Sequence, residues 1–221
     1  MKDYEAICAA HKYFWEMKGQ NRPFIIFCLD WVNGPKLIDS VPNLISGRIS
    51  PSDIHAEDFL PMHEKLCLED EALCDDKLGM VEPLCALPWM EAFFGCGVVR
   101  NGHHMWTQKV ISSVDEIESA IEKGPDFAWQ RCYFDYINSL SEAFSGRWAV
   151  AQPILRGITD VACAMMGEEA LVYAMYDEPD LIRSFLEYIC DRQRAFYQEQ
   201  MRRIPAFHDG YAVGQYHIWS P

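Results

Sequence analysis

The sequence predicts an α/β fold in which the strands of a parallel sheet alternate with helices. Residues 148–155 form a short apolar run with the length of a buried strand, and a turn at 156–157 leads into a helical pattern of small residues at 161–166. Residues 24–29 form a second, uninterrupted apolar run, which is typical of a strand buried on both faces. Helical patterns separate the two runs. A strand joined to a helix by a tight turn is half of a βαβ unit.

The elements of the first part of the chain follow from their start and stop signals. An amphipathic helical pattern over 3–17 precedes the apolar run at 24–29. Ser50 begins another helix that extends to about residue 73, and Pro61 is expected to kink or divide it. Residues 80–85 predict a further strand.

The later elements follow from the same signals. Ser113 and Glu116 form a capping-box pattern at the start of a helix. No linker or internal repeat interrupts the chain, so we expect one domain over 1–221. The remaining segments are predicted as short strands at 96–100 and 103–106, helices at 114–121, 126–144, 168–176 and 179–203, and a last strand at 207–213.

Composition and charge restrict the function. The formal net charge of −14 argues against nucleic acids and anionic membranes as partners, because both attract basic surfaces. No apolar run is long enough to span a membrane, and the first residues lack the apolar core of a signal peptide. The nine cysteines are scattered without a Cys-x-x-Cys motif, which favours reduced thiols and a cytoplasmic location.

Reactive groups of βα barrels lie at the carboxyl ends of the strands, and this rule selects the candidate site residues. Asp30 and Asp209 are the candidates for a general acid or base, although each also fits a turn. His217 could ligate a metal, transfer protons or be structural. The candidates for substrate binding are Trp31, Asn33, Gln152, Arg156, Tyr211 and His217.

Arg156 is the most informative of these residues. It stands between a strand end and a helix start, where the guanidinium and the helix dipole both favour an anion. This position predicts a small-molecule substrate that carries a carboxylate. The alternative is a surface ion pair with Asp160 or Glu168. We expect Asp30, Trp31, Arg156 and Asp209 to line one pocket.

Several segments resemble the uroporphyrinogen decarboxylase superfamily, which includes the methylcobamide:coenzyme M methyltransferases. The order of the segments carries the resemblance, and it spans most of the chain. The matching segments are 22–27 (RPFIIF), 88–96 (PWMEAFFGC), 155–160 (LRGITD), 167–171 (GEEAL), 176–181 (YDEPDL) and 209–221 (DGYAVGQYHIWSP).

The resemblance implies an eight-stranded (β/α)8 TIM barrel. Such a barrel typically needs about 250 residues, so we expect this chain to be roughly its N-terminal half. A lone half-barrel would leave unpaired edges. We therefore expect a missing second half or association with another copy, which makes the chain a possible homo-oligomer.

The resemblance also implies one of two activities. The decarboxylases act on porphyrinogens without a cofactor and use arginines after the first strand, but residues 28–33 contain no arginine. The methyltransferases act with a corrinoid protein and bind zinc through a His-x-Cys in the second half of the barrel, and this chain has no His-x-Cys. We expect no cofactor within this chain, and an enzyme closer to the methyltransferases or to another branch. The alternative is a non-catalytic half-barrel that acts through self-association or a partner chain.

Overall fold

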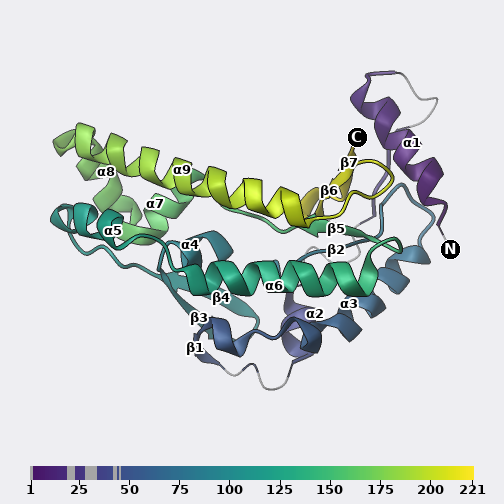
Figure 1. Ribbon diagram of the computed structural model, residues 1–221, viewed down its shortest axis with the longest axis horizontal. Coiled ribbons are helices and arrows are strands. Elements are labelled where there is room, and N and C mark those ends of the chain that lie inside the picture. The colour runs from purple at the N-terminus through teal and green to yellow at the C-terminus, as the bar shows by residue number, and fades with distance from the viewer. Residues whose placement is uncertain (1, 19–22, 28–33, 42–43, 45) are drawn as a thin grey trace.

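The computed structural model describes residues 2–18, 23–27, 34–41, 44 and 46–221, and it shows a mixed α/β protein (Figure 1). In the described part, one sheet has the order β1-β3-β4 and is antiparallel. The other has the order β2-β5-β6-β7. Its first three strands are parallel, and β7 is antiparallel to β6. The predicted α/β class and a three-stranded parallel part are thus present, whereas β7 and the whole second sheet are antiparallel, and the described residues do not close a barrel.

The strands of both sheets are short. The antiparallel sheet contains β1 (Gly47–Ile49), β3 (Gly97–Asn101) and β4 (His104–Gln108). The mixed sheet contains β2 (Met80–Val81), β5 (Ala149–Gln152), β6 (Tyr211–Val213) and β7 (Ile218–Ser220).

Helices make up most of the structure, and most of the predicted ones are present. The helix expected after Ser50 begins instead with a 3-10 turn, and α3 continues past Pro61 undivided. The helices are α1 (Tyr4–Trp15), α2 (Gly34–Asp39), α3 (Ala56–Glu71), α4 (Trp89–Phe93), α5 (Ile117–Lys123), α6 (Phe127–Phe144), α7 (Ile158–Met166), α8 (Glu168–Asp177) and α9 (Pro179–Arg203), with 3-10 turns at Pro51–Asp53, Val114–Glu116 and Gly214–Tyr216.

The prediction of a buried strand over 24–29 is wrong for the residues that the structure describes. Residues 23–27 form no strand, and the side chains of Ile25 and Phe27 are 42% and 51% exposed. The backbone N–H groups of these two residues donate to the carboxylates of Asp76 and Asp75, each over 2.8 Å. Only alternate side chains of the segment are covered, so it lies along the margin of the sheet and not in its centre.

The two longest helices, α6 and α9, pack against each other and cover the mixed sheet (Figure 1). Aromatic side chains fill the space between them, and the rings of Tyr133 and Phe196 lie 5.0 Å apart. Both helices also carry a buried polar side chain toward the sheet, Tyr133 from α6 and Gln200 from α9. This packing brings polar groups to the strand ends.

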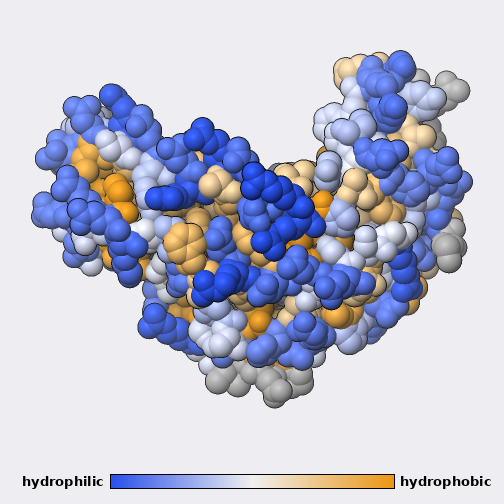
Figure 2. Space-filling model, in the orientation of Figure 1, coloured by the Kyte–Doolittle hydropathy of each residue, from blue (hydrophilic) through white to orange (hydrophobic). Residues whose placement is uncertain are grey.

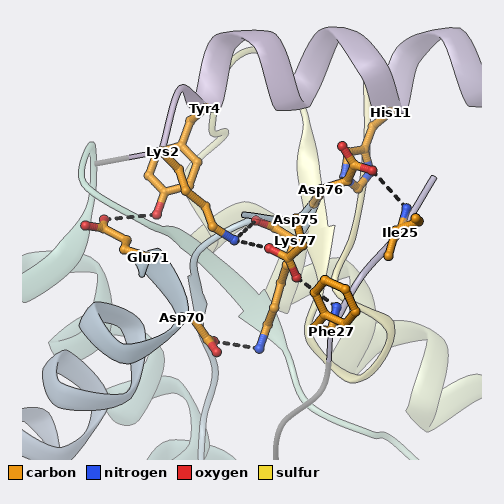
Figure 3. Close-up of polar contacts among 10 residues, drawn as sticks. All are labelled: Lys2, Tyr4, His11, Ile25, Phe27, Asp70, Glu71, Asp75, Asp76 and Lys77. Atoms are coloured by element: carbon orange, nitrogen blue, oxygen red, sulfur yellow. Dashed lines mark hydrogen bonds and ion pairs between the residues drawn. The ribbon is translucent and has the colours of Figure 1, made fainter. Parts of the chain in front are cut away.

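Buried polar contacts attach the N-terminal segment to the loop before β2 (Figure 3). Lys2 forms a buried ion pair with Asp75 and donates to the carbonyl of Lys77 over 3.0 Å. His11 is buried and uses both ring nitrogens. Its Nδ1 accepts from the backbone N–H of Trp219 over 3.0 Å, so its Nε2 donates to the Asp76 carbonyl over 3.2 Å. The His11 ring therefore joins α1 to the loop before β2 and to β7.

Candidate functional site

The carboxyl ends of the three parallel strands meet at one edge of the mixed sheet. The strand β2 ends at Val81, which pairs with Val150 of β5, and Gln152 at the end of β5 pairs with Val213 of β6. Parallel strands place their carboxyl ends side by side. Polar groups at or just after these ends therefore come together, although they are far apart in the sequence.

Gly214, the residue after β6, packs directly against the residue after β2. A Cβ at this position would lie 1.8 Å from Glu82 Oε2 and 2.9 Å from the carbonyl oxygen of Gln152. No side chain fits in that space, so glycine is required here for the close approach of the backbone. The contact places the Glu82 carboxyl at the meeting point of the three strands.

The Glu82 carboxyl is turned inward. Its Oε2 is buried without a hydrogen-bond partner among the described residues, and the thiol of Cys85 hydrogen-bonds the carboxyl group. Burial raises the pKa of Glu82 to about 8, against the smaller opposing effects of Cys85 and of the Lys77 ammonium. Glu82 is therefore mostly protonated at pH 7. A neutral carboxylic acid is a hydrogen-bond donor and can act as a general acid.

His217 faces the same interior space as Glu82. Its backbone is left-handed, with φ at 50°, and its Nδ1 is buried without a partner among the described residues. Burial, with smaller contributions from the charges of Lys77 and Lys2 and against the opposing effect of Asp75, lowers the pKa of His217 to about 4. The imidazole is therefore neutral at pH 7.

A cavity of about 30 Å³ separates these groups. Its polar lining also includes His63, Cys67, Asp70 and Cys85. A volume of ~30 Å³ suits one water molecule and is too small for an organic substrate. A buried polar atom without a partner costs about 1–3 kcal/mol, so Glu82 Oε2 and His217 Nδ1 both favour a polar occupant.

Gln152 is held by a chain of hydrogen bonds from the two long helices. Tyr133 OH donates to Gln200 Oε1 over 2.5 Å, and Gln200 Nε2 donates to Gln152 Oε1 over 2.7 Å. With its carbonyl oxygen occupied, the Gln152 side chain keeps its NH₂ group as a donor at the strand end. Gln152, predicted as a substrate-binding residue, thus lies beside Glu82.

Arg156 lies on the loop between β5 and α7, and its side chain is 59% exposed. Its Nε is 3.6 Å from Oε1 of the buried Glu91, whose pKa is raised by burial. The ion pair that sequence reasoning considered with Asp160 or Glu168 is thus made with Glu91. Asp160 instead accepts from the N–H of Gly157 over 3.1 Å at the start of α7.

The other predicted residues do not join this group. Asp209 is exposed in a turn before β6, with φ at 62°, and Tyr211 begins that strand. Both precede β6, whereas Arg156 follows the parallel strand β5, so Asp209 and Arg156 lie at opposite ends of the sheet. The Asp-Gly turn explains Asp209. Asp30, Trp31 and Asn33 lie outside the described residues.

Sequence reasoning missed Glu82, Gly214, Tyr133 and Gln200 as members of the site. Glu82 was placed inside a predicted strand at 80–85, whereas β2 ends at Val81, which makes Glu82 the first residue beyond the strand. With the strand ending at Val81, the rule that reactive groups lie at the carboxyl ends of strands would have selected Glu82. Buried positions in long helices carry no comparable signal for Tyr133 and Gln200.

Comparisons with protein-family models, with curated proteins and with solved structures gave no match. Among the described residues, no three His, Cys, Asp or Glu side chains are grouped to hold a metal ion. None of the helices in the described ranges combines the length and the apolarity needed to cross a membrane.

Proposed function

We propose that this chain belongs to an enzyme of the uroporphyrinogen-decarboxylase-like type and that Glu82 is its proton donor. In this proposal β2, β5 and β6 are neighbouring strands of a βα barrel, and their carboxyl ends bind a small molecule that bears a carboxylate. The observation that carries the proposal is the inward-facing, mostly neutral Glu82 carboxyl at the point where the three strands end.

Decarboxylation fits these residues better than methyl transfer. Loss of CO₂ from a substrate breaks a carbon–carbon bond and leaves the electron pair on carbon, and that carbon must then take a proton. The cavity beside Glu82 is too small for the substrate, so in this proposal the substrate binds beside Gln152, and a protonated Glu82 supplies the proton at the strand ends and becomes a carboxylate. The Gln152 NH₂ group, held by Gln200, can donate to a carboxylate of the substrate.

Methyl transfer would need zinc and a corrinoid protein. The described residues bring together no set of zinc ligands, so no step is assigned to zinc. Residues 28–33 contain none of the arginines that the resemblance implies for porphyrinogen binding, which points to a substrate other than uroporphyrinogen.

Carboxylate binding tests the proposal. Pyrrole-3-acetate and citrate are titrated into the 221-residue protein, and binding is followed by NMR chemical shifts. We expect binding to weaken as the pH rises through about 8, because ionised Glu82 repels the ligand. In Glu82→Gln binding should persist without that dependence, and Gln152→Leu should weaken it about tenfold.

The matched control is Glu118→Gln on α5, which lies outside the strand-end group. It should bind the probes as the wild type does. If neither carboxylate binds, or if Gln152→Leu binds them unchanged, the proposed substrate site is refuted.

The second candidate is a non-catalytic half-barrel that acts by association, and an exposed apolar surface favours it. Figure 2 shows a hollow between α9 and α1 with hydrophobic residues at its floor, and Figure 1 places β6 there. Tyr211 and Val213 are exposed on one face of that strand. An exposed apolar sheet face of this kind is a common site of protein association.

Molar mass by light scattering tests this alternative. Association predicts a mass at least twice 25.5 kDa that returns to the monomer value in Val213→Glu. Because Val213 is exposed, this substitution leaves the core intact. A wild-type protein that stays monomeric at high concentration contradicts self-association.

A further inference from the structure

Two polar atoms at the cavity next to Glu82 have no hydrogen-bond partner in the part of the chain that the structure describes, whereas the other polar side chains around it are hydrogen-bonded or ion-paired. His63 Nε2 is hydrogen-bonded to Tyr136 OH over 3.1 Å, and Cys67 donates to the Met80 carbonyl over 3.3 Å. Asp70 is paired with Lys77 over 2.6 Å. Cys85 is hydrogen-bonded to the Glu82 carboxyl. Among the described residues that line the cavity, Glu82 Oε2 and His217 Nδ1 are the buried side-chain atoms left without a hydrogen-bond partner.

We propose that one ordered water molecule in this cavity bridges Glu82 Oε2 and His217 Nδ1, and that His217 exchanges the Glu82 proton with solvent through it. The proposal extends the proposed function, because a proton donor that has given up its proton must regain it before the next turnover. It assigns to His217 a role as proton carrier.

The geometry fits one bridging water. The cavity volume of about 30 Å³ exceeds the minimum that a water molecule needs, and a buried water usually bridges two or more polar groups. Both atoms line the same cavity, at the ends of adjacent segments of chain. Gly214, in the turn after β6, also lines the cavity, and its missing side chain leaves room for the Glu82 carboxyl.

His217 connects the cavity with the surface. The residue is only partly buried, while its Nδ1 is fully enclosed, so the rest of the ring reaches toward solvent. The ring accepts a proton from solvent at Nε2, and the proton on Nδ1 passes to the water. The water in turn gives one of its own protons to the Glu82 carboxylate. The imidazole is left neutral with a proton on Nε2, and a flip of the ring brings this protonated nitrogen to the water for the next transfer.

Fixed charges near this path come from several elements. The ammonium of Lys77 acts on both Glu82 and His217, and Asp75 and Lys2 also act on His217. Lys77 and Lys2 are held in the buried ion pairs with Asp70 and Asp75. These positive charges disfavour a lasting imidazolium, so His217 passes a proton on and does not retain it.

Infrared spectroscopy of the 221-residue protein tests the relay without ligand or turnover. The carbonyl band of neutral Glu82 is assigned by its disappearance in Glu82→Gln, and its shift after mixing with D₂O measures proton exchange. We expect His217→Gln to slow this exchange at least tenfold while the band remains. Glutamine can hydrogen-bond the water, but its side chain is not protonated in this pH range and so cannot pass a proton on. His208→Gln, at an exposed histidine in the turn before β6, is the matched control and should exchange at the wild-type rate.

Unchanged exchange in His217→Gln would overturn the relay, as would the absence of a neutral carboxyl band. A crystal structure of the wild-type protein gives a second measurement that needs no variant. Density for a water within hydrogen-bonding distance of both atoms supports the proposal, and an empty cavity refutes it. Slowed exchange in a protein that binds neither carboxylate probe would retain the relay and reject the proposed substrate site.

Discussion

Replacing Glu82 by glutamine should change how the stability of the protein depends on pH. The pKa of Glu82 is about 8 in the folded protein and 4.5 as an ordinary carboxyl. Between these values the folded protein keeps a proton that the unfolded chain has released, so the free energy of unfolding falls as the pH rises. The stabilising effect of the neutral form is complete below pH 4.5 and is lost as the pH rises through 8.

The size of the effect follows from the two pKa values. Each pH unit in this interval lowers the free energy of unfolding by about 1.4 kcal/mol. The accumulated cost of burying Glu82 is thus roughly 3 kcal/mol at pH 7 and roughly 4–5 kcal/mol above pH 8. Glutamine is close to the neutral acid in shape and does not titrate, so Glu82→Gln escapes this cost.

Urea unfolding followed by circular dichroism from pH 5 to pH 9 measures the effect. Other titrating groups cancel in the difference between variant and wild type. We expect that difference to grow in favour of Glu82→Gln as the pH rises, and to stay constant for the surface control Glu118→Gln. A constant difference for Glu82→Gln would refute the claim that the folded protein holds this carboxyl neutral.

Three further predictions follow from the contacts around the site and the N-terminal segment. In Gly214→Ala the new Cβ displaces the Glu82 carboxyl, so we expect the neutral carboxyl band to disappear and the stability to fall by about 1–3 kcal/mol; an unshifted band contradicts the packing. Gln200→Leu should weaken binding of the carboxylate probes about tenfold by releasing Gln152, and Gln200→Glu should weaken it at least as much, because glutamate keeps the acceptor oxygen for Tyr133 but loses the donor to Gln152 and adds a negative charge. Burial lowers the pKa of His11, so the protein should lose stability as the pH falls below about 6.5. Tryptophan fluorescence should report this loss, and it should be smaller in the non-titrating variant His11→Gln.

The helices could be predicted well from the sequence because their signals are local. Asp3 and Asp126 cap α1 and α6 by accepting from backbone N–H groups over 3.0 Å and 2.9 Å. Gly167 ends α7 with φ at 94°, a conformation that favours glycine. Each of these signals lies within a few residues of the boundary it sets, so no tertiary contact is needed to interpret it.

The strands could be predicted only in part, because an apolar run does not reveal how many of its faces are covered. The run at 24–29 has the composition of a central strand, but its described part is fixed to Asp75 and Asp76 at the margin of the sheet. The strand β2 is so short that a boundary error of a few residues hides Glu82. Because of this boundary error, the rule that reactive groups follow strand ends selected Gln152 and His217 but not Glu82, which lies beside them.

The neutral state of Glu82 depends on long-range packing that no local pattern contains. Burial is the largest cause of its raised pKa, and the backbone of Gly214 supplies part of that burial from a segment more than a hundred residues away. Gly214 is held there because β6 pairs with β5. If β6 separated from β5, water would reach the carboxyl and Glu82 would ionise at pH 7. The proposed proton donor is therefore active only while β6 is docked, which couples the chemistry of the site to the pairing of these two strands.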